Sequence, residues 1–561
     1  MKKFLAVLLA CGMILSLAAC GSSSDDDTTE EETTEEEETE EVEEETEEEE
    51  ETEEEEVEEE EEAEEEEEED EYLVFSFGTD ANSTTFDPAS DLQTNSGNFL
   101  VHAVGETLWT CDDDGNVTLK LAESYEYTDE ALTVTLQDGI LFSNGDELDA
   151  EDVLVTIQHF ADTERTASMF VAMDLENAEI SDDGLTLTIP MTSYDAAIVD
   201  VLGNASFMIM DADVIGQEDY DYGWLIGTGP YMLQGDGETD TSGWEESVSY
   251  TLVRNENYWG DEPYYDELDV YFYSEESTLY ADFQAGNLDA IYLTESTYIN
   301  NLGSGAVSGA SLIQEVEDGV SGFEMAYSED SNQSMSDLNI RMAFAHALDV
   351  DSMVTSMGEG IYETASSLVG EGSWIYEDLG VYEYDPDAAA EYLAEAGYSV
   401  DNPYTIYVYA ESTAWNSDLF EAAQAYCAEI GINLDLSGLA DFSTILPTLL
   451  AGDQDMTFGQ ASNGSGNDPA NLLQQFGPYS DNVLIKVTDD DLVETWNLAI
   501  QSTDEEERTE YYYDFMEGIY ENYYFVPVCV SIKNYGVLDE HTSFADAIDT
   551  SNCVDPTLLT D

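Results

Sequence analysis

Alternating apolar and polar positions mark the most informative stretch of the chain, which runs from Leu132 to Phe160. Leucine and valine at 132, 134 and 136 alternate with threonine at 133 and 135, which predicts a half-buried strand. Asp138-Gly139 and Asn144-Gly145 predict two turns on either side of a short strand, because glycine and asparagine tolerate positive φ. Asp149 and the acidic residues after it precede apolar residues at helical spacing, which predicts a capped helix.

The same patterns predict further elements along the chain. Asp385 followed by Pro386 predicts a helix that Asp385 caps and Gly397 ends. Apolar residues at helical spacing predict a helix within Phe99–Leu108 and helical structure over Asp489–Tyr524. Alternating or continuous apolar runs predict strands at Leu73–Gly78, Leu185–Ile189 and Phe525–Val530. We also expect a strand at Leu450–Met456, with the sequence LAGDQDM.

Taken in order, the motifs of these stretches resemble family 5 of the bacterial extracellular solute-binding proteins, which serve ABC importers of oligopeptides, dipeptides and nickel. The first motif is LQDGILFSNGDELDAEDV, which departs from the family pattern at Gln137, where arginine is usual. The resemblance as a whole extends from about Tyr72 to the end of the sequence. Further motifs follow in the family's order: GTGPY, LVRNENYWG, DLNIRMAFAHALDVDSM and DPDAAAEYLAEAGY.

The resemblance implies an α/β fold of the periplasmic-binding-protein type, with two lobes, an extra subdomain and a hinge that the chain crosses twice. We expect lobe I over residues 72–296, with the extra subdomain at about 115–222, and lobe II over 297–526. A return segment over 527–561 would complete lobe I. Such a protein closes its lobes around a solute and presents the closed form to a membrane permease.

The first seventy residues predict an export signal and a tether. Lys2-Lys3 and the short apolar run that follows are typical of a signal peptide, and the run is too short to span a bilayer. LAAC ending at Cys20 resembles a lipobox, which implies lipidation of Cys20 and anchoring at the extracellular face of a membrane. Residues 21–71, the acidic linker, are almost all Glu, Asp and Thr, which predicts a disordered spacer; weak cation binding by it stays open.

Composition narrows the possible partners. The chain has 561 residues, 42% of them hydrophobic, which is enough for two or three domains. It carries 9 Lys plus Arg against 132 Asp plus Glu, for a net charge of −123. Nucleic-acid binding is excluded as a function class because phosphate contacts need Lys and Arg. Such acidity favours neutral or cationic ligands, and adaptation to salt is the alternative explanation.

No pattern in the sequence predicts catalysis, a cofactor or a metal centre. Zinc-protease, nucleophile-elbow and phosphate-loop motifs are absent from it. Four histidines, at 102, 159, 346 and 541, are not spaced as metal ligands, and the cysteines form no CxxC pair. Cys111, Cys427, Cys529 and Cys553 could pair or stay buried, and their spacing does not choose between these outcomes. A secreted hydrolase is the remaining enzyme hypothesis.

The resemblance also places the ligand cleft. Its expected ligand-binding residues lie before the first helix, after the crossover and in one loop rich in Gly, Ser and Asn: Thr94, Asn95, Ser96, Tyr327, Ser462, Asn463, Ser465, Asn467 and Asp468. Peptide-binding relatives have an aspartate at the position of Ser465, and that aspartate pairs with the peptide's ammonium. A hydroxyl cannot replace that charge, so Asp468 or a shifted loop would have to supply it, or the loop is only a surface turn.

The sequence therefore does not decide which solute the protein binds. A peptide is the expected solute, with an oligosaccharide or nickel as alternatives within the family. A receptor for a signalling peptide would have the same fold and a different partner. Arg341 is expected to make a structural ion pair and not to contact the ligand, because it lies within a predicted helix.

Overall fold

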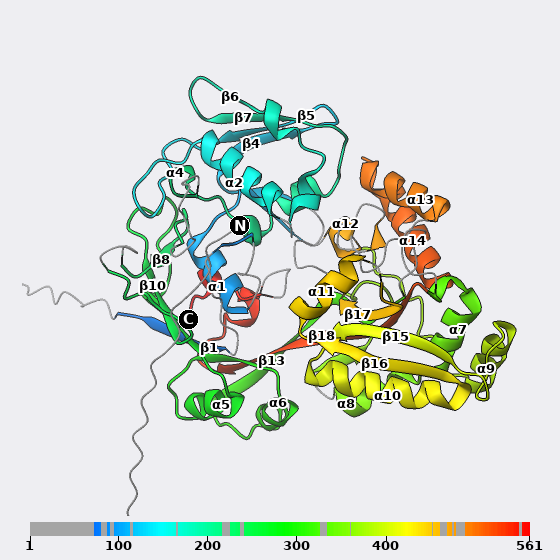
Figure 1. Cartoon of the computed structure of the whole chain (residues 1–561). Coiled ribbons are helices and arrows are strands. Elements are labelled where there is room, and N and C mark those ends of the chain that lie inside the picture. The colour runs from blue at the N-terminus through cyan, green and yellow to red at the C-terminus, as the bar shows by residue number, and fades with distance from the viewer. Residues whose placement is uncertain are drawn as a thin grey trace, which may run out of the picture. The chain divides into compact units, whose positions relative to one another are not determined.

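The computed structural model describes residues 72–79, 87–89, 95–112, 116–163, 166–215, 225–235, 240–325, 334–358, 361–451, 453–460, 468–473, 476–477, 489–548 and 553–561. The chain divides into two units, Met1–Glu69 and Asp70–Asp561. Cys20 and the first unit lie outside the described residues. The described residues of the second unit are drawn as ribbons in Figure 1.

One 12-stranded mixed sheet runs through this unit in the order β16-β15-β17-β13-β18-β12-β1-β11-β10-β8, with β14 on β18 and β9 on β10. Its strands are β1 (Val74–Thr79), β8 (Tyr231–Leu233), β9 (Trp244–Glu245), β10 (Ser249–Arg254), β11 (Glu267–Phe272), β12 (Ala290–Leu293), β13 (Ala310–Met325), β14 (Tyr362–Thr364), β15 (Tyr404–Glu411), β16 (Ile432–Ala440), β17 (Met456–Gln460) and β18 (Phe525–Leu538). Parallel pairs occur on both sides, at β1–β11 and β1–β12 and at β15–β16 and β15–β17.

The two longest strands join the halves of this sheet. β13 and β18 have 16 and 14 residues, and their antiparallel pairing extends from Ala310–Leu538 to Glu324–Phe525. One end of this ladder adjoins β12 and the other adjoins β17 (Figure 1). This architecture confirms the expected two-lobed α/β fold, with two chain crossings between the halves.

A separate four-stranded antiparallel sheet lies outside the large one. It has the order β4-β5-β7-β6, with β4 (Ala122–Tyr127), β5 (Ala131–Leu136), β6 (Glu179–Ile180) and β7 (Thr186–Pro190). A short hairpin of β2 (Trp109–Cys111) and β3 (Val117–Leu119) precedes it in the chain. Threonine pairs across β5 and β7 lie 3.2 and 3.3 Å apart, so the polar face of the alternating pattern is matched strand to strand.

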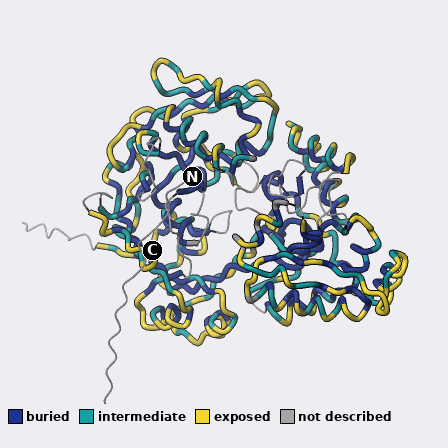
Figure 2. The backbone as a smooth tube through the Cα atoms, viewed as in Figure 1, coloured by how far each residue is buried: buried dark blue, intermediate teal, exposed yellow. Residues whose placement is uncertain are grey.

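Helices cover the sheets and bury one face each. Their bounds are α1 (Asn95–Val104), α2 (Ala150–Asp162), α3 (Ile198–Val201), α4 (Ala212–Ile215), α5 (Glu276–Gln284), α6 (Ser296–Gly303), α7 (Leu338–Ala347), α8 (Val350–Met357), α9 (Pro386–Glu395), α10 (Ala414–Ile430), α11 (Phe442–Ala451), α12 (Pro469–Leu472), α13 (Asp490–Gln501) and α14 (Glu505–Glu521). Figure 2 shows buried backbone along the large sheet and more exposed residues on the outer helices. Helices α7 to α10 pack with β13, β15 and β16 into one apolar cluster, while α1, α2 and α14 belong to another.

The stretch from Leu132 to Phe160 folds as its pattern predicts. β5 is followed by Gly139 and Gly145, whose φ values of +85° and +92° need glycine. The short strand between the turns is reduced to one bridge from Leu141 to Glu147. Asp149 caps α2 in a capping box with Asp152, so the predicted cap is confirmed.

Two of the predicted elements differ in the structure. The helical region expected over 489–524 is two helices, because Asp504 accepts a hydrogen bond from the Glu507 N–H and starts α14. The strand expected at 450–456 begins only at Met456, because α11 continues through Ala451. The predicted cap of α9 by Asp385 is confirmed, and Gly397 has the expected positive φ of +92°.

Cysteines and arginine take structural places. Cys427, Cys529 and Cys553 are buried, Cys111 is partly buried, and all four are free thiols. Arg341 donates to the backbone oxygens of Met335 and Asn522 at 2.6 and 2.8 Å, inside the lobe that carries α7.

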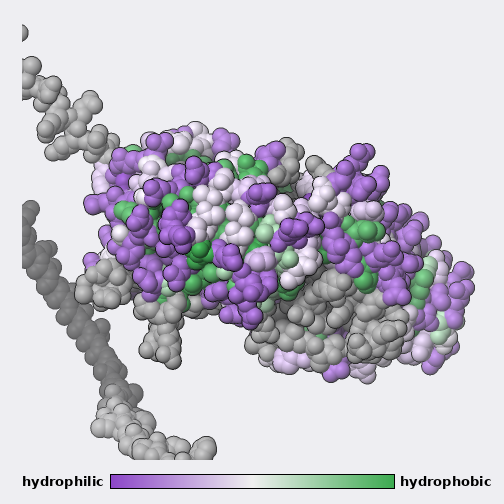
Figure 3. Space-filling model, turned by 90° about the horizontal axis from the view of Figure 1, so that it is seen from above, coloured by the Kyte–Doolittle hydropathy of each residue, from purple (hydrophilic) through white to green (hydrophobic). Residues whose placement is uncertain are grey.

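The face of the molecule drawn in Figure 3 is mostly hydrophilic, with smaller apolar patches between the polar side chains. Among the described helices, none combines the length and the apolar character that crossing a bilayer requires.

Candidate functional site

Two distant parts of the chain meet around the carboxylate of Asp200, which lies in the short helix α3. The Oδ2 atom of Asp200 accepts the backbone N–H of Asp468 at 3.0 Å and the side-chain amide of Asn471 at 3.1 Å. A second bond runs nearby from the Ala196 N–H to the Ile500 carbonyl at 2.9 Å. We call this set of contacts the α3 junction; it joins residues 196–200 to α12 and α13.

Asp468 lies at the centre of the α3 junction, where it begins α12. Its carboxylate accepts the Ala470 N–H at 2.8 Å, as a helix cap does, and binds Arg508 Nη2 through both oxygens at 2.7 and 2.9 Å. The two side chains are only 8% and 13% exposed. Since water is largely excluded, the charge of Asp468 is compensated by Arg508 inside the protein.

Arg508 is itself held in place on several sides. Its Nε atom faces the Ala499 carbonyl at 3.3 Å, and its guanidinium lies 5.8 and 5.5 Å from the ring centres of Trp374 and Tyr512. An arginine fixed in this way keeps α12, α13 and α14 in register with one another.

Asp195 is the second acidic group packed against this junction. Burial raises the pKa of its carboxyl to about 6; the Ala197 N–H opposes the shift, and the charge of Asp468 adds to it. Asp195 is therefore a carboxyl whose ionisation at neutral pH works against the packing around it.

We expect the substitution Asp195→Asn to stabilise the protein at pH 7. A carboxyl whose pKa is raised on folding gives stability that is fully present below its unfolded pKa and is lost as pH rises through about 6. The amide keeps an acceptor for the Ala197 N–H and carries no charge. We expect the variant to gain about 1–2 kcal/mol of stability at pH 7, where the native carboxyl is charged, and nothing at pH 4, where it is protonated. The gain at pH 7 is modest because residual contact with water screens the charge. Thermal unfolding of both proteins at the two pH values measures this; an equal difference at pH 4 and pH 7 would contradict it.

A cavity of about 290 Å³ adjoins the α3 junction on the Asp200 side. Its walls come mainly from the end of α1 and the loop after it, the end of β2, α3 with the residues after it, and the C-terminal segment. The lining residues are His102, Gly105, Glu106, Thr107, Thr110, Cys111, Lys120, Asp200, Gly203, Asn204, Ala205, Pro230, Tyr258, Ile548, Asp555 and Thr557. Carboxylates outnumber cations along this wall, so the cavity favours a cationic or neutral group.

Two side chains of the cavity show what chemistry it offers. Glu106 accepts hydrogen bonds from Trp259 Nε1 at 2.7 Å and from the Thr228 hydroxyl at 2.9 Å, while burial raises its pKa. Burial, with Asp200 as the next cause, raises the pKa of Cys111 to about 12, so its thiol stays protonated and is a poor nucleophile. The lining is therefore suited to binding by hydrogen bonds and charge.

The expected cleft residues have different places. Ser96 is buried in α1, where its carbonyl accepts the Tyr250 hydroxyl at 2.6 Å, and it does not line the cavity. Asn95 begins α1. Asp468 is at the α3 junction. The other six lie outside the described residues: Thr94, Tyr327, Ser462, Asn463, Ser465 and Asn467.

Asp200 and Arg508 were not predicted from the sequence. The scarcity of cations was a usable signal for Arg508, because few of the 132 acids can have a basic partner. Asp200 gives no such signal, since it is one acid among many and its partners lie 268 and 271 positions away.

Comparison with known proteins places this fold in a family of transport proteins. Heme-binding protein A of Haemophilus influenzae is 24% identical over 450 residues, which cover 73% of this chain and 78% of that protein. Among solved structures, NikA from Brucella suis in complex with Fe(III)-EDTA has a TM-score of 0.72 at 21% identity and covers 87% of this chain and 99% of its own. DppA from Helicobacter pylori in complex with peptide STSA has a TM-score of 0.70 at 19% identity, covering 87% and 98%.

The family itself follows from a match that extends over most of the folded unit. The model of the bacterial extracellular solute-binding proteins, family 5 Middle, matches residues 116–482. This range includes the four-stranded sheet, all strands of the large sheet except β1 and β18, and the helices α3 and α12. The chain therefore belongs to family 5 of the bacterial extracellular solute-binding proteins, as its motifs predicted.

Proposed function

We propose that this chain is the extracellular substrate-binding lipoprotein of an ABC importer, and that it captures an oligopeptide or dipeptide between its lobes. It would pass the peptide chemically unchanged to a membrane permease with its ATPase. Lipidation of Cys20 would hold it at the cell surface, with the acidic linker as spacer. Relatives whose names state peptide, heme and nickel binding support the transport role, and they leave the solute to be argued from this chain's own residues.

The α3 junction is the observation that carries this proposal. We place residues 194–205 in lobe I and α12 to α14 in lobe II, so that the bonds of Asp200 and Ala196 are contacts made on closure. The residues that line the adjoining cavity belong to lobe I, and the cavity meets lobe II through Asp200 of the α3 junction. A solute that reaches from the cavity to α12 would bind the closed form more tightly and shift the equilibrium toward it.

The charges of the cavity favour a peptide with a free amino terminus. Ser465 stands where peptide-binding relatives have an aspartate, and the charge of Asp468 is already compensated by Arg508. The carboxylates of Glu106, Asp200 and Asp555 surround the cavity instead, facing the single lysine Lys120. We propose that one or more of these carboxylates binds the ammonium group of the ligand.

Thermal shift and calorimetry on the full chain test this proposal. The panel contains di- to pentapeptides, the same peptides N-acetylated, malto- and cello-oligosaccharides, and nickel with histidine. We expect stabilisation by free-amine peptides, and binding at least about tenfold weaker for the acetylated forms, because a charged hydrogen bond contributes about 1.5–3 kcal/mol. Chromatography of the mixture should recover the peptide intact.

Asp200→Asn is the informative variant, because it removes the charge and keeps an acceptor for the Asp468 N–H. Asp213→Asn, a neutralised acid that does not line the cavity, is its control. Binding of neutral glycans alone would overturn the peptide assignment, and equal binding of free and acetylated peptides would overturn the role of the carboxylates. Consumption of the peptide would overturn the transport role in favour of a hydrolase.

A further inference from the structure

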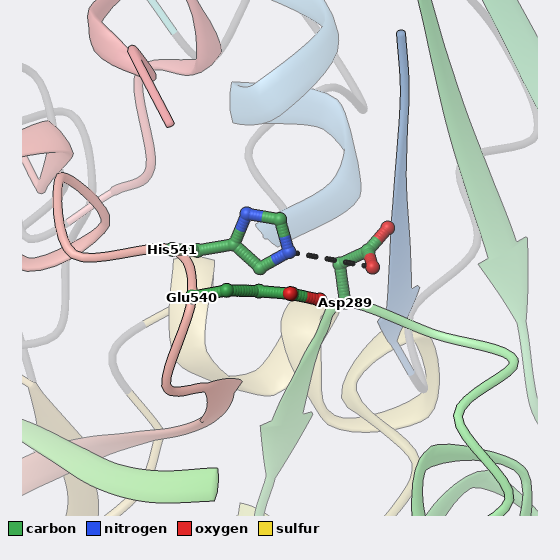
Figure 4. A group of neighbouring side chains, drawn as sticks. All are labelled: Asp289, Glu540 and His541. Carbon is green, nitrogen blue, oxygen red and sulfur yellow. Dashed lines mark ion pairs between the residues drawn. The ribbon is translucent and has the colours of Figure 1, made fainter. Parts of the chain in front are cut away.

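Three potential metal ligands converge where the central strands β12 and β18 of the large sheet begin and end, outside the cavity and the α3 junction. Asp289 immediately precedes β12, and Glu540 and His541 follow β18. The backbone joins them, since the Leu538 N–H donates to the Asp289 carbonyl at 2.9 Å. One ligand atom from each side chain lies within 4.8 Å of the other two. Figure 4 shows the three side chains next to one another, with the ion pair between His541 and Asp289 drawn as a dashed line.

The far side of the His541 ring fixes its tautomer. Nδ1 lies 2.9 Å from the Asp561 carbonyl oxygen and 3.0 Å from the Tyr265 hydroxyl, and that hydroxyl also donates to the same carbonyl. A carbonyl oxygen only accepts, so Nδ1 carries the hydrogen. The Phe75 ring meets the imidazole edge-on at 5.2 Å and holds its plane. Nε2 therefore faces the carboxylates, and in the neutral imidazole it presents its lone pair to them, as in metal sites where a second partner orients the histidine.

The His541 side chain is only 9% exposed, and its Nε2 atom is buried and makes no aligned hydrogen bond. It lies 3.3 Å from Oδ1 of Asp289. The other oxygen of Asp289 accepts the Ser76 N–H at 2.7 Å, which fixes the carboxylate with Oδ1 toward the histidine. A lone pair facing a carboxylate oxygen in a dry position is unfavourable unless a proton on Nε2 or a metal cation lies between them.

We propose that Asp289, Glu540 and His541 bind a divalent transition-metal ion, with Zn²⁺ as the ion that this donor set fits. Zinc takes nitrogen and carboxylate ligands at about 2.0–2.2 Å, so the edge of its tetrahedron measures about 3.4 Å. The 3.3 Å between Nε2 and Oδ1 matches that edge. Ca²⁺ and Mg²⁺ prefer sets made of oxygen alone, which argues against them here. Exposed Glu540 closes the third corner, and water completes the fourth.

Bound at this place, the ion would fasten the C-terminal segment to the large sheet. Asp289 immediately precedes β12, which pairs with β1 inside the large sheet. His541 leads into the segment that ends at Asp561. The site contains no group of the α3 junction or of the cavity, so its role is structural and independent of the solute.

Cobalt spectroscopy on the full chain separates this site from the many other acids. After dialysis against EDTA, one equivalent of Co²⁺ should give the intense visible absorption of tetrahedral cobalt, and Zn²⁺ should abolish it. Ions held weakly by the acidic linker keep octahedral shells and absorb weakly. His541→Gln should remove the band and weaken Zn²⁺ binding in calorimetry at least about tenfold, as loss of a ligand requires. Asp213→Asn, in the oxygen-only group of Asp146, Asp211 and Asp213, should leave both unchanged.

Imidazole NMR of the unsubstituted protein decides the question even if a variant fails to fold. The chain has only four histidines, so each Nε2 signal can be followed during zinc addition. We expect the His541 signal alone to move to the metal-bound range. Absence of a tetrahedral cobalt band, or a band that persists in His541→Gln, would overturn the proposal and leave an imidazole–carboxylate ion pair.

Discussion

The substitution Glu324→Gln is expected to stabilise the protein strongly in alkaline solution and hardly at all in acid. Glu324 lies in β13 between Thr457 of β17 and Phe525 of β18, fully buried, and neither of its carboxylate oxygens has a hydrogen-bond partner. Its Oε1 lies so close to Gly459 that a side chain there would collide with it. Burial raises the pKa of Glu324 to about 8.

The sign of the effect follows from the direction of that shift. A raised carboxyl pKa gives stability that is fully present below about pH 4.5 and is lost as pH rises through about 8. The shift from 4.5 to about 8 corresponds to a loss on the order of 5 kcal/mol across this window. Glutamine cannot ionise, so the variant should lose none of it at this position.

Unfolding midpoints at pH 5, 7 and 9 measure this prediction. We expect the difference between Glu324→Gln and the unsubstituted protein to grow with pH. Glu391→Gln, on the exposed surface of α9, is the matched control, and its difference should stay near zero throughout. A constant difference for Glu324→Gln across the three pH values would show that the carboxyl does not titrate in this range.

The substitution Arg508→Met is expected to cost about 3–5 kcal/mol of stability, since it removes one partner of a buried ion pair. The Asp468 carboxylate would keep its Ala470 cap and lose both contacts to Nη2. Because the backbone N–H of Asp468 donates to Asp200, we expect solute binding to weaken together with stability.

The double variant Arg508→Met with Asp468→Asn identifies the cause. It removes both charges and keeps an acceptor at the start of α12, so it should recover a large part of the lost stability. The coupling between the two substitutions measures their interaction. Additive losses in thermal unfolding would mean that Arg508 acts through Ala499, Trp374 and Tyr512 and not through Asp468.

Local elements were predictable wherever the residues that specify them are neighbours in sequence. The cap of α2 by Asp149, the turn at Gly145 and the end of α9 at Gly397 each depend on a few adjacent residues. The break between α13 and α14 was missed, although residues 501–510 contain no apolar side chain and Asp504 with Glu507 three positions later is a helix-start signal.

Contacts between residues far apart in the chain could not be predicted from the sequence, for a physical reason. Glu324 stands between Phe323 and Met325, and simple alternation would turn it toward water; β13 is instead central in the sheet and covered on both faces. Asp289 and His541, like Asp200 and Asp468, meet only because β12, β18 and α12 are brought together by the fold. With 132 acids available, no spacing rule could select Asp200 or Asp289.

Hydrogen exchange at the α3 junction tests the central claim, that a solute is gripped by closure of two lobes, most directly. The backbone N–H of Asp468 donates to Asp200, and the N–H of Ala196 donates to Ile500. With the peptide that gives the largest thermal shift, both amides should exchange at least about tenfold more slowly than in its absence, because opening becomes rarer. Saturating binding that leaves exchange unchanged in both segments would contradict the account.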